Sequence, residues 1–147
     1  MRSILLVLLF FIAYLPEAHA QTEAPKPAQK EEGQEAVVGP DFVAGAWTGV
    51  GSQENGSSWS IILTADPANG DFAISYPSLA CGGHWTLDKH DATRAWFVEK
   101  ITYGLNNCID NSLVGVTLLS REYLTITYFY PDGDLAAWST LTKMEEE

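Results

Sequence analysis

The sequence predicts an all-β domain, an antiparallel meander of about eight short strands that forms a small barrel or a curled sandwich. Three observations favour this fold. Turn-forming residues break the chain at short, regular intervals, and the segments between them are rich in β-branched and aromatic residues. In addition, no long stretch of the chain shows convincing helical periodicity.

Turn residues divide the folded part into eight predicted strands. Between positions 65 and 71, the Asn69-Gly70 pair predicts a hairpin connection, because both residue types tolerate a positive φ. Gly82-Gly83 and Asp132-Gly133 mark two further breaks. The predicted strands cover 43–50, 58–65, 71–76, 83–87, 94–103, 113–119, 122–130 and 135–142.

The first predicted strand contains Gly45-Ala46-Trp47. This Gly-x-Trp form is similar to the first strand of lipocalin-like barrels, in which the Trp closes one end of the barrel. A plain core Trp is the alternative explanation. The expected architecture is therefore a small lipocalin-like barrel or a curled sandwich, and the sequence does not distinguish the two.

A carboxylate interrupts the apolar face of the strand predicted at 94–103. By alternation, Glu99 shares its face with Ala95, Phe97, Ile101 and Tyr103. A carboxylate in such a place is either buried with a partner or lines a cavity. If it is buried and weakly paired, its pKa rises, as it does in catalytic acids. The alternative is a structural anchor that bonds to Arg121 or to a Tyr hydroxyl.

The strand predicted at 122–130 is apolar on both of its alternating faces. Such a strand is expected at the centre of a sheet, or with one face used for binding. Trp96, Tyr128 and Tyr130 are the candidates for an exposed recognition surface, because their strand neighbours already fill the other face. Trp and Tyr dominate binding hot spots, so these three residues are predicted to contact a ligand or a partner.

The N-terminal residues 1–20 have the pattern of a cleavable signal peptide: Arg2, an apolar run, and Ala18-His19-Ala20. The run has about twelve residues, fewer than the roughly twenty that a membrane-spanning helix needs. An uncleaved anchor is the alternative. We therefore expect a periplasmic or secreted protein that does not insert into the membrane after signal cleavage.

Composition changes again after the signal segment. Residues 21–41 are rich in Pro, Glu, Gln and Lys and are predicted to be a disordered tether. The all-β domain is expected to cover 42–143, and 144–147 form an acidic tail.

The chain has two cysteines, Cys81 and Cys108, and an even number in an exported chain predicts a disulfide. The bond would close a loop of about 28 residues and add roughly 3–4 kcal/mol to stability. Two free thiols or a metal site are the alternatives, but two cysteines without a suitable His pair are a poor zinc set.

No catalytic, metal or cofactor motif is recognisable. His84 alternates with Trp85 and is expected to face solvent, and His90 lies in a polar segment, 88–91, predicted as a turn. No nucleophile elbow, zinc-protease, phosphate-loop or dinucleotide pattern occurs. The net charge of −11 disfavours binding to nucleic acid. We therefore predict a protein that is not an enzyme and needs no cofactor.

Three patterns carry a family resemblance. They are Gly-x-Trp-x-Gly from Gly45, Tyr-Pro-x-Leu-x-Cys-x-Gly from Tyr76, and Glu-x-Ile-x-x-Gly-x-x-x-Cys from Glu99. Their order resembles a small exported bacterial domain that also occurs at the extracytoplasmic end of some Ser/Thr kinase-like receptors. The resemblance covers about 44–142. It implies the β fold and the disulfide, but no activity and no ligand.

These observations predict an exported, non-catalytic binding module for a protein or a small ligand. An inhibitor of an exported hydrolase is one version of this function. A lipocalin-like carrier of a small apolar ligand is the first alternative, and an enzyme of unrecognised type is the second. The protein is expected to be a monomer.

Overall fold

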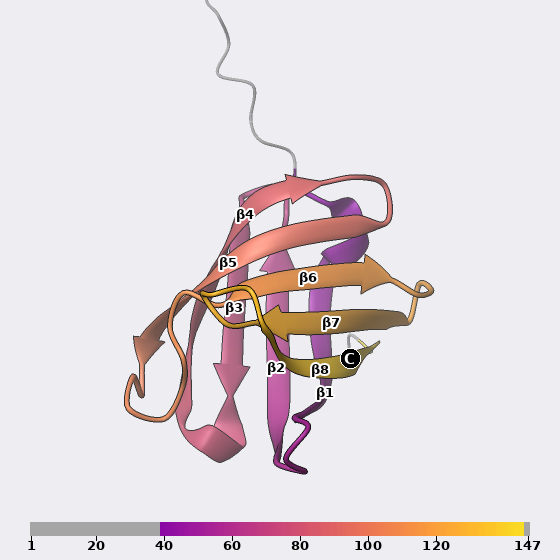
Figure 1. The fold of residues 1–147 in the computed structure, drawn as a ribbon. Helices are drawn as coiled ribbons and strands as arrows, with labels where there is room; N and C mark the ends of the chain where they lie inside the picture. The colour runs from indigo at the N-terminus through magenta and orange to yellow at the C-terminus, as the bar shows by residue number, and fades with distance from the viewer. Residues whose placement is uncertain (1–38, 146–147) are drawn as a thin grey trace, which may run out of the picture. The chain divides into compact units, whose positions relative to one another are not determined.

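The computed structural model of the chain describes residues 39–145. Within them, each strand pairs antiparallel with the next and the first pairs with the last, so the sheet is a closed barrel (Figure 1). The strands are β1 (Gly45–Ser52), β2 (Ser58–Asp66), β3 (Asp71–Tyr76), β4 (Cys81–His90), β5 (Arg94–Tyr103), β6 (Leu113–Leu118), β7 (Tyr123–Phe129) and β8 (Leu135–Lys143).

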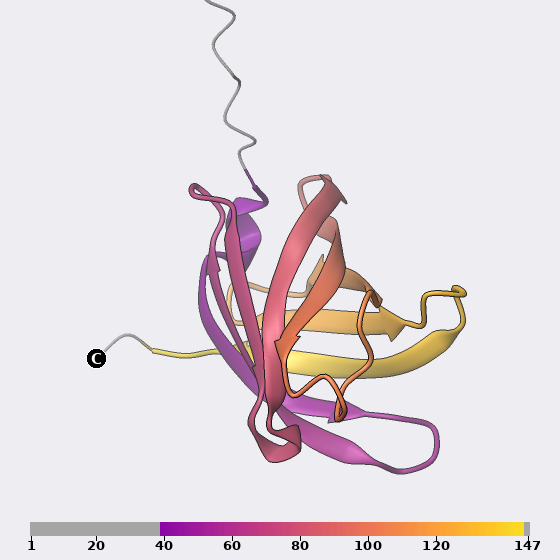
Figure 2. The same cartoon turned by 90° about the vertical axis from the view of Figure 1, so that its left-hand side faces the viewer.

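Closure of the sheet settles which architecture the chain adopts. The β1–β8 pairing runs from Trp47 opposite Lys143 to Ser52 opposite Trp138. Figure 2 shows the strands curving around a common interior. The predicted all-β meander is therefore confirmed as a barrel, and a curled sandwich is excluded. Closing the sheet also leaves no unpaired strand edge.

The strand bounds agree with the predicted ones to within two residues, except at the end of β4. The predicted turn over 88–91 is wrong, because β4 continues to His90, which pairs with Ala95 of β5. A shift of register between Leu87 and Lys89 lets the strand continue past its apolar part. The polar side chains of this stretch are exposed, and the real turn begins at Asp91.

Two single-turn 3₁₀ helices were not predicted from the sequence. The first, η1 (Asp41–Val43), precedes β1, and the second, η2 (Pro77–Leu79), connects β3 to β4. Pro77 ends β3, as predicted, because proline cannot donate to the ladder. Ala80 then adopts a left-handed conformation with φ of 52° and directs the chain into β4.

Trp47 and η1 close one end of the barrel. The Trp47 side chain is fully buried, and its Nε1 donates a hydrogen bond to the Val43 carbonyl oxygen at 2.8 Å. The Lys143 ammonium lies 5.3 Å from the centroid of the Trp47 ring. Trp47 is thus a core residue that also ties the strand to the segment before it.

The ordered domain begins earlier than predicted. Gly39 and Pro40 are buried, and the Gly39 amide donates to the Pro67 carbonyl oxygen at 3.2 Å. This backbone bond holds the segment against the β2–β3 turn, so the prediction of a tether through residue 41 is wrong for 39–41. The predicted signal peptide 1–20 and the rest of the tether lie outside the described residues, as do 146–147.

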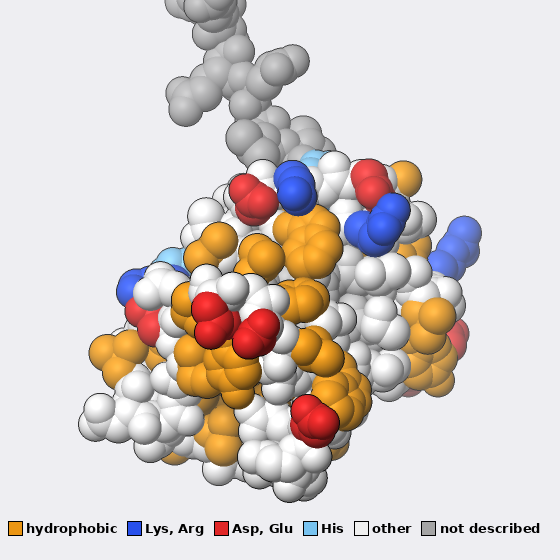
Figure 3. Space-filling view, viewed as in Figure 1, with side chains coloured by type: hydrophobic (Ala, Val, Ile, Leu, Met, Phe, Trp, Pro, Cys, Tyr) orange, Lys and Arg blue, Asp and Glu red, His pale blue; other side chains and the backbone are white. Residues whose placement is uncertain are grey.

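Large side chains fill the middle of the barrel. The ring centroids of Phe72 and Phe97 are 4.9 Å apart, and those of Trp85 and Phe97 are 5.4 Å apart. On the outer face over β4 to β8, apolar side chains lie beside acidic and basic ones (Figure 3). No helix in the described part of the chain is long and apolar enough to span a membrane.

Candidate ligand-binding cavity

A cavity of about 290 Å³ opens at the barrel end opposite Trp47. This end carries the β1–β2 and β7–β8 hairpins, η2, and the connection between β5 and β6. The rings of Trp59, Tyr76 and Tyr128 line the cavity together with the Glu99 carboxyl group. Leu79 supplies further apolar surface.

The cavity exists because small residues face inward at this end. Ala137 of β8 is buried directly opposite Tyr128 of β7 and contributes only a methyl group. On β1, Gly51 is paired with Trp59, and a Cβ at Gly51 would lie 2.5 Å from the Trp59 ring. The missing side chain therefore lets the Trp59 indole pack against the backbone of β1.

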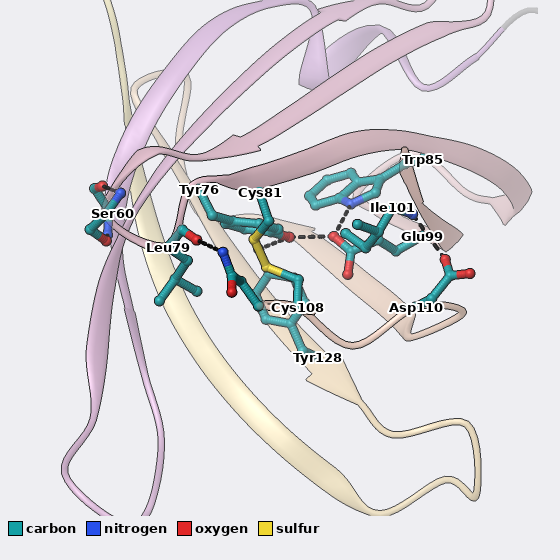
Figure 4. Close-up of a disulfide and its surroundings, with 12 residues drawn as sticks. Ser60, Tyr76, Leu79, Cys81, Trp85, Glu99, Ile101, Cys108, Asp110 and Tyr128 are labelled. Carbon is teal, nitrogen blue, oxygen red and sulfur yellow. Dashed lines mark hydrogen bonds between the residues drawn. A yellow bond between two sulfur atoms is a disulfide. The ribbon is translucent and has the colours of Figure 1, made fainter. Parts of the chain in front are cut away.

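The disulfide between Cys81 and Cys108 fixes the rim of the cavity, as the cysteine pattern predicted. Cys81 is the first residue of β4, and Cys108 lies in the β5–β6 connection and lines the cavity (Figure 4). The Asn107 side-chain amide donates to the Leu79 carbonyl oxygen at 2.9 Å. This connection is thus joined to η2 and to the start of β4.

Asp110 fastens the same connection to β5. Its Oδ1 accepts a hydrogen bond from the Ile101 amide at 2.9 Å, and its Oδ2 is bonded to the Lys100 ammonium. The Asn111 amide also donates to the Glu99 carbonyl oxygen at 3.0 Å. The connection is therefore held on both sides of the cavity mouth.

Glu99 is the buried acid of the site, with 4% of its surface exposed. Its Oε1 accepts hydrogen bonds from the Tyr76 hydroxyl and, at 3.1 Å, from Trp85 Nε1 (Figure 4). The hydroxyl oxygens of Tyr76 and Tyr128 are 3.4 Å apart. Glu99 and Trp85 face each other because they are cross-strand partners on β5 and β4.

Burial raises the pKa of Glu99, because the barrel removes water from the carboxylate. The hydrogen bonds from Tyr76 and Trp85 lower this pKa in part, and the negative charge of Asp110 raises it further. Burial also raises the pKa of both tyrosines, and the Glu99 charge adds to that rise. Both phenols therefore keep their protons at ordinary pH, and Tyr76 donates to Glu99.

No side chain within the described part of the chain supplies a positive charge to Glu99. The described residues that line the cavity include no Lys, Arg or His. Arg121, one of the partners considered from the sequence, is exposed in the β6–β7 turn at the opposite end of the barrel. The other possibility, a Tyr hydroxyl, is confirmed in Tyr76. Lys100 points outward and pairs with Asp110 instead.

The structure separates the four predicted binding residues. Glu99 and Tyr128 line the cavity, but the prediction that Tyr128 is exposed is wrong, because only 5% of its surface is accessible. Trp96 lies half-buried outside the barrel, with its ring centroid 5.9 Å from that of Phe129. Tyr130 follows β7, is half-buried, and does not line the cavity.

Sequence reasoning missed Tyr76, Trp59 and Trp85 as members of the site. Tyr76 alternates with Phe72 and Ile74, and this pattern could have placed its hydroxyl inside the barrel. Its approach to Glu99 depends on the register of β3, β4 and β5, which the sequence does not show.

The histidines do not enter the site. His84 is exposed on the outer face of β4, and His90 is exposed at the end of the same strand. Among the described residues, no three or more His, Cys, Asp or Glu side chains are close enough to hold a metal ion.

Comparisons with known proteins find similarity among solved structures. No family model matches the chain, and no curated protein matches it. Among solved structures, the chain is similar to one described as a redesigned beta barrel, with 16% sequence identity and a TM-score of 0.47. The alignment covers 74% of this chain and 96% of that one.

Proposed function

We propose that this chain is an exported, non-catalytic binding protein that holds a small ligand in the open end of its barrel. The observation that carries the proposal is the cavity, in which one buried carboxyl group faces aromatic walls. Small-molecule sites are concave and mostly apolar, with a few convergent polar groups, and this cavity has that composition.

Export is supported by two independent features. Residues 1–20 have the signal-peptide pattern, and the Cys81–Cys108 disulfide is compatible with an oxidising compartment. Both features support a periplasmic or secreted location.

The cavity favours a small ligand over a protein partner, and a partly polar ligand over a purely apolar one. Two of the residues first considered for protein binding, Trp96 and Tyr130, lie apart from the cavity. The buried Glu99 makes the site unlike the interior of a carrier for purely apolar compounds, because an apolar ligand would leave the carboxyl group without a new partner.

Filling the cavity tests the proposal. Ala137→Leu places a larger side chain beside Tyr128, inside the cavity. The matched control is Ala73→Leu, the same change at an exposed position of β3. The full chain is expressed with its own N-terminal sequence, purified as the host processes it, and examined by native mass spectrometry and by thermal shift against a fragment library.

We expect the wild type and Ala73→Leu to retain a bound mass or to be stabilised by the same fragments. Ala137→Leu should lose both effects while its unfolding transition remains cooperative. Two results would reject the proposal: equal binding by Ala137→Leu, or an empty wild-type protein that no fragment stabilises.

A further inference from the structure

One oxygen of the Glu99 carboxyl group accepts hydrogen bonds from the protein, and the other is available to a ligand. Both hydrogen bonds that it receives, from Tyr76 and Trp85, end on Oε1. Figure 4 shows the second oxygen turned away from these two donors. In the described part of the chain, every fully enclosed side-chain oxygen has a hydrogen-bond partner. Oε2 has none among the hydrogen bonds of Glu99, so it is not fully enclosed and reaches the cavity.

The surroundings of Glu99 lack positive charge. The group is packed against Trp85 on β4, Tyr76 on β3, Tyr128 on β7, and the β5–β6 connection, which carries Asp110. The titratable groups among these are two tyrosines and one further carboxylate, and none is cationic. A buried carboxylate without a counter-charge is unfavourable, so the empty site favours the protonated acid.

Aromatic faces make up much of the remaining wall. Tyr76 and Tyr128 pack edge to face, with ring centroids 6.3 Å apart, and Trp59 lines the same cavity. The face of an aromatic ring carries negative potential and attracts cations, most strongly when water is excluded. A carboxyl group beside aromatic rings is therefore electrostatically suited to a positively charged ligand.

The size of the cavity limits the ligand. A water molecule takes about 30 Å³ of liquid volume. A cavity of about 290 Å³ therefore holds about ten non-hydrogen atoms. This is enough for one charged group and a short apolar body.

We propose that the cavity binds a compact organic ammonium ion, whose N–H group donates to Glu99 Oε2 while its apolar body lies against Trp59 and Leu79. This inference rests on the proposed function, since it names the ligand class of the same cavity. The ligand supplies the positive charge that the described lining of the cavity does not. The protein's net charge of −11 also attracts cations toward the barrel.

At pH values where the empty protein holds Glu99 protonated, binding is coupled to one proton. In the empty cavity, burial holds the Glu99 pKa above its usual range, and the ammonium ion then favours the carboxylate. The proton leaves Glu99 for solvent as the ammonium ion enters. The positive charge of the ammonium ion then balances the negative charge of the Glu99 carboxylate. Affinity for an amine should therefore rise with pH until Glu99 is ionised in the empty protein.

Three probes of similar shape test the assignment by isothermal titration calorimetry on the wild-type protein. They are 2-phenylethylamine, 2-phenylethanol and 3-phenylpropanoate, which are cationic, neutral and anionic at neutral pH. We expect the amine to bind at least about tenfold more tightly than the alcohol, and the anion not to bind. In titrations repeated near pH 4.5, where the raised pKa keeps Glu99 protonated in the empty protein, the enthalpy of amine binding should vary with the ionisation enthalpy of the buffer, because a proton is released.

Glu99→Gln should reduce amine affinity about tenfold or more and remove the buffer dependence, with little effect on the alcohol. Asp71→Asn removes the same charge from an exposed position at the start of β3 and should leave amine binding unchanged. The buffer dependence is measured on the wild type, so the test stands even if the Glu99 variant folds poorly.

The outcomes separate this inference from the proposed function. Tighter binding of the alcohol or the anion overturns the ammonium assignment and leaves the cavity as a ligand site. Equal amine affinity in the wild type and in Glu99→Gln also overturns the ammonium assignment and leaves the cavity as a ligand site. If none of the three probes binds, a retained neutral mass that Ala137→Leu removes overturns the ammonium assignment alone. An empty wild type that no fragment stabilises overturns both the assignment and the proposed function.

Discussion

Glu99 is the buried carboxylic acid that lines the cavity of this barrel. The sequence placed it on an apolar face and left two roles open, an anchor or a cavity group. In the structure one carboxyl oxygen anchors Tyr76 and Trp85, and the other meets the cavity. Alternation along β5 was enough to predict burial. The identity of the partners was not predictable, because Tyr76 and Trp85 belong to other strands.

For Tyr128, the sequence predicted the wrong environment, an exposed position instead of a buried one. Its strand is apolar on both faces, so alternation pairs Tyr128 with Leu124 and Ile126 but does not say which face is inside. Closure of the barrel decides the question, because it turns this face toward Ala137 and the interior. A hydroxyl that could have been on the surface therefore lies 3.4 Å from the Tyr76 hydroxyl.

The buried acid should make stability depend on pH in an unusual direction. The native Glu99 holds its proton to a higher pH than the unfolded chain does, whose pKa is near 4.5. Native protein therefore binds more protons above that value, so the free energy of unfolding falls as pH rises, by up to about 1.4 kcal/mol per pH unit. This decline ends above the raised native pKa.

Glu99→Gln removes this titration. We expect the variant's free energy of unfolding, relative to wild type, to increase as pH rises from about 4.5. Urea unfolding followed by tryptophan fluorescence at a series of pH values measures the difference. Asp91 and Asp110, whose pKa values are lowered, lose their contributions only below their usual value of 3.8, outside this window. A constant difference between variant and wild type would contradict the expectation.

Among the elements, β4 and the β5–β6 connection determine the shape of the cavity end. Gly82 and Gly83 were predicted to break the chain, but they lie within β4 at a shift of register against β5. A Cβ at Gly83 would lie 1.8 Å from the Lys100 carbonyl oxygen, so only glycine permits this approach of the two strands. Turn residues predicted most strand ends correctly, whereas this bulged pairing depends on contacts between strands.

The disulfide should stabilise the cavity end more than the barrel as a whole. Reduction, or the double variant Cys81→Ala with Cys108→Ala, is expected to lower stability by roughly 3–4 kcal/mol. Amide hydrogen exchange should then accelerate chiefly over 104–112, because without the disulfide only hydrogen bonds such as those of Asn107, Asp110 and Asn111 hold that connection. The double variant provides the control, since adding a reductant should have no further effect on it.

A uniform increase in exchange over all eight strands would contradict this expectation. It would mean that the cross-link maintains the whole barrel rather than the rim.

For the whole molecule, the decisive feature is the pairing of β1 with β8. Each strand in the described residues has two neighbours, so the sheet offers no edge to a second copy. We expect the protein to be monomeric at micromolar concentration in size-exclusion chromatography with light scattering. A stable dimer would mean that outer-face residues such as Trp138, which is 45% exposed, form an interface instead.

Trp47 is fully buried at one end of the barrel, and the cavity lies at the other end. If the proposed function is correct, a ligand enters and leaves at the cavity end, and selectivity and residence time depend on different parts of the chain. Glu99 should then discriminate among ligands, while the disulfide-bound rim around Cys108 should set how quickly each ligand exchanges. Substitutions at the rim should therefore change association and dissociation rates together, and leave the order of affinities as it was.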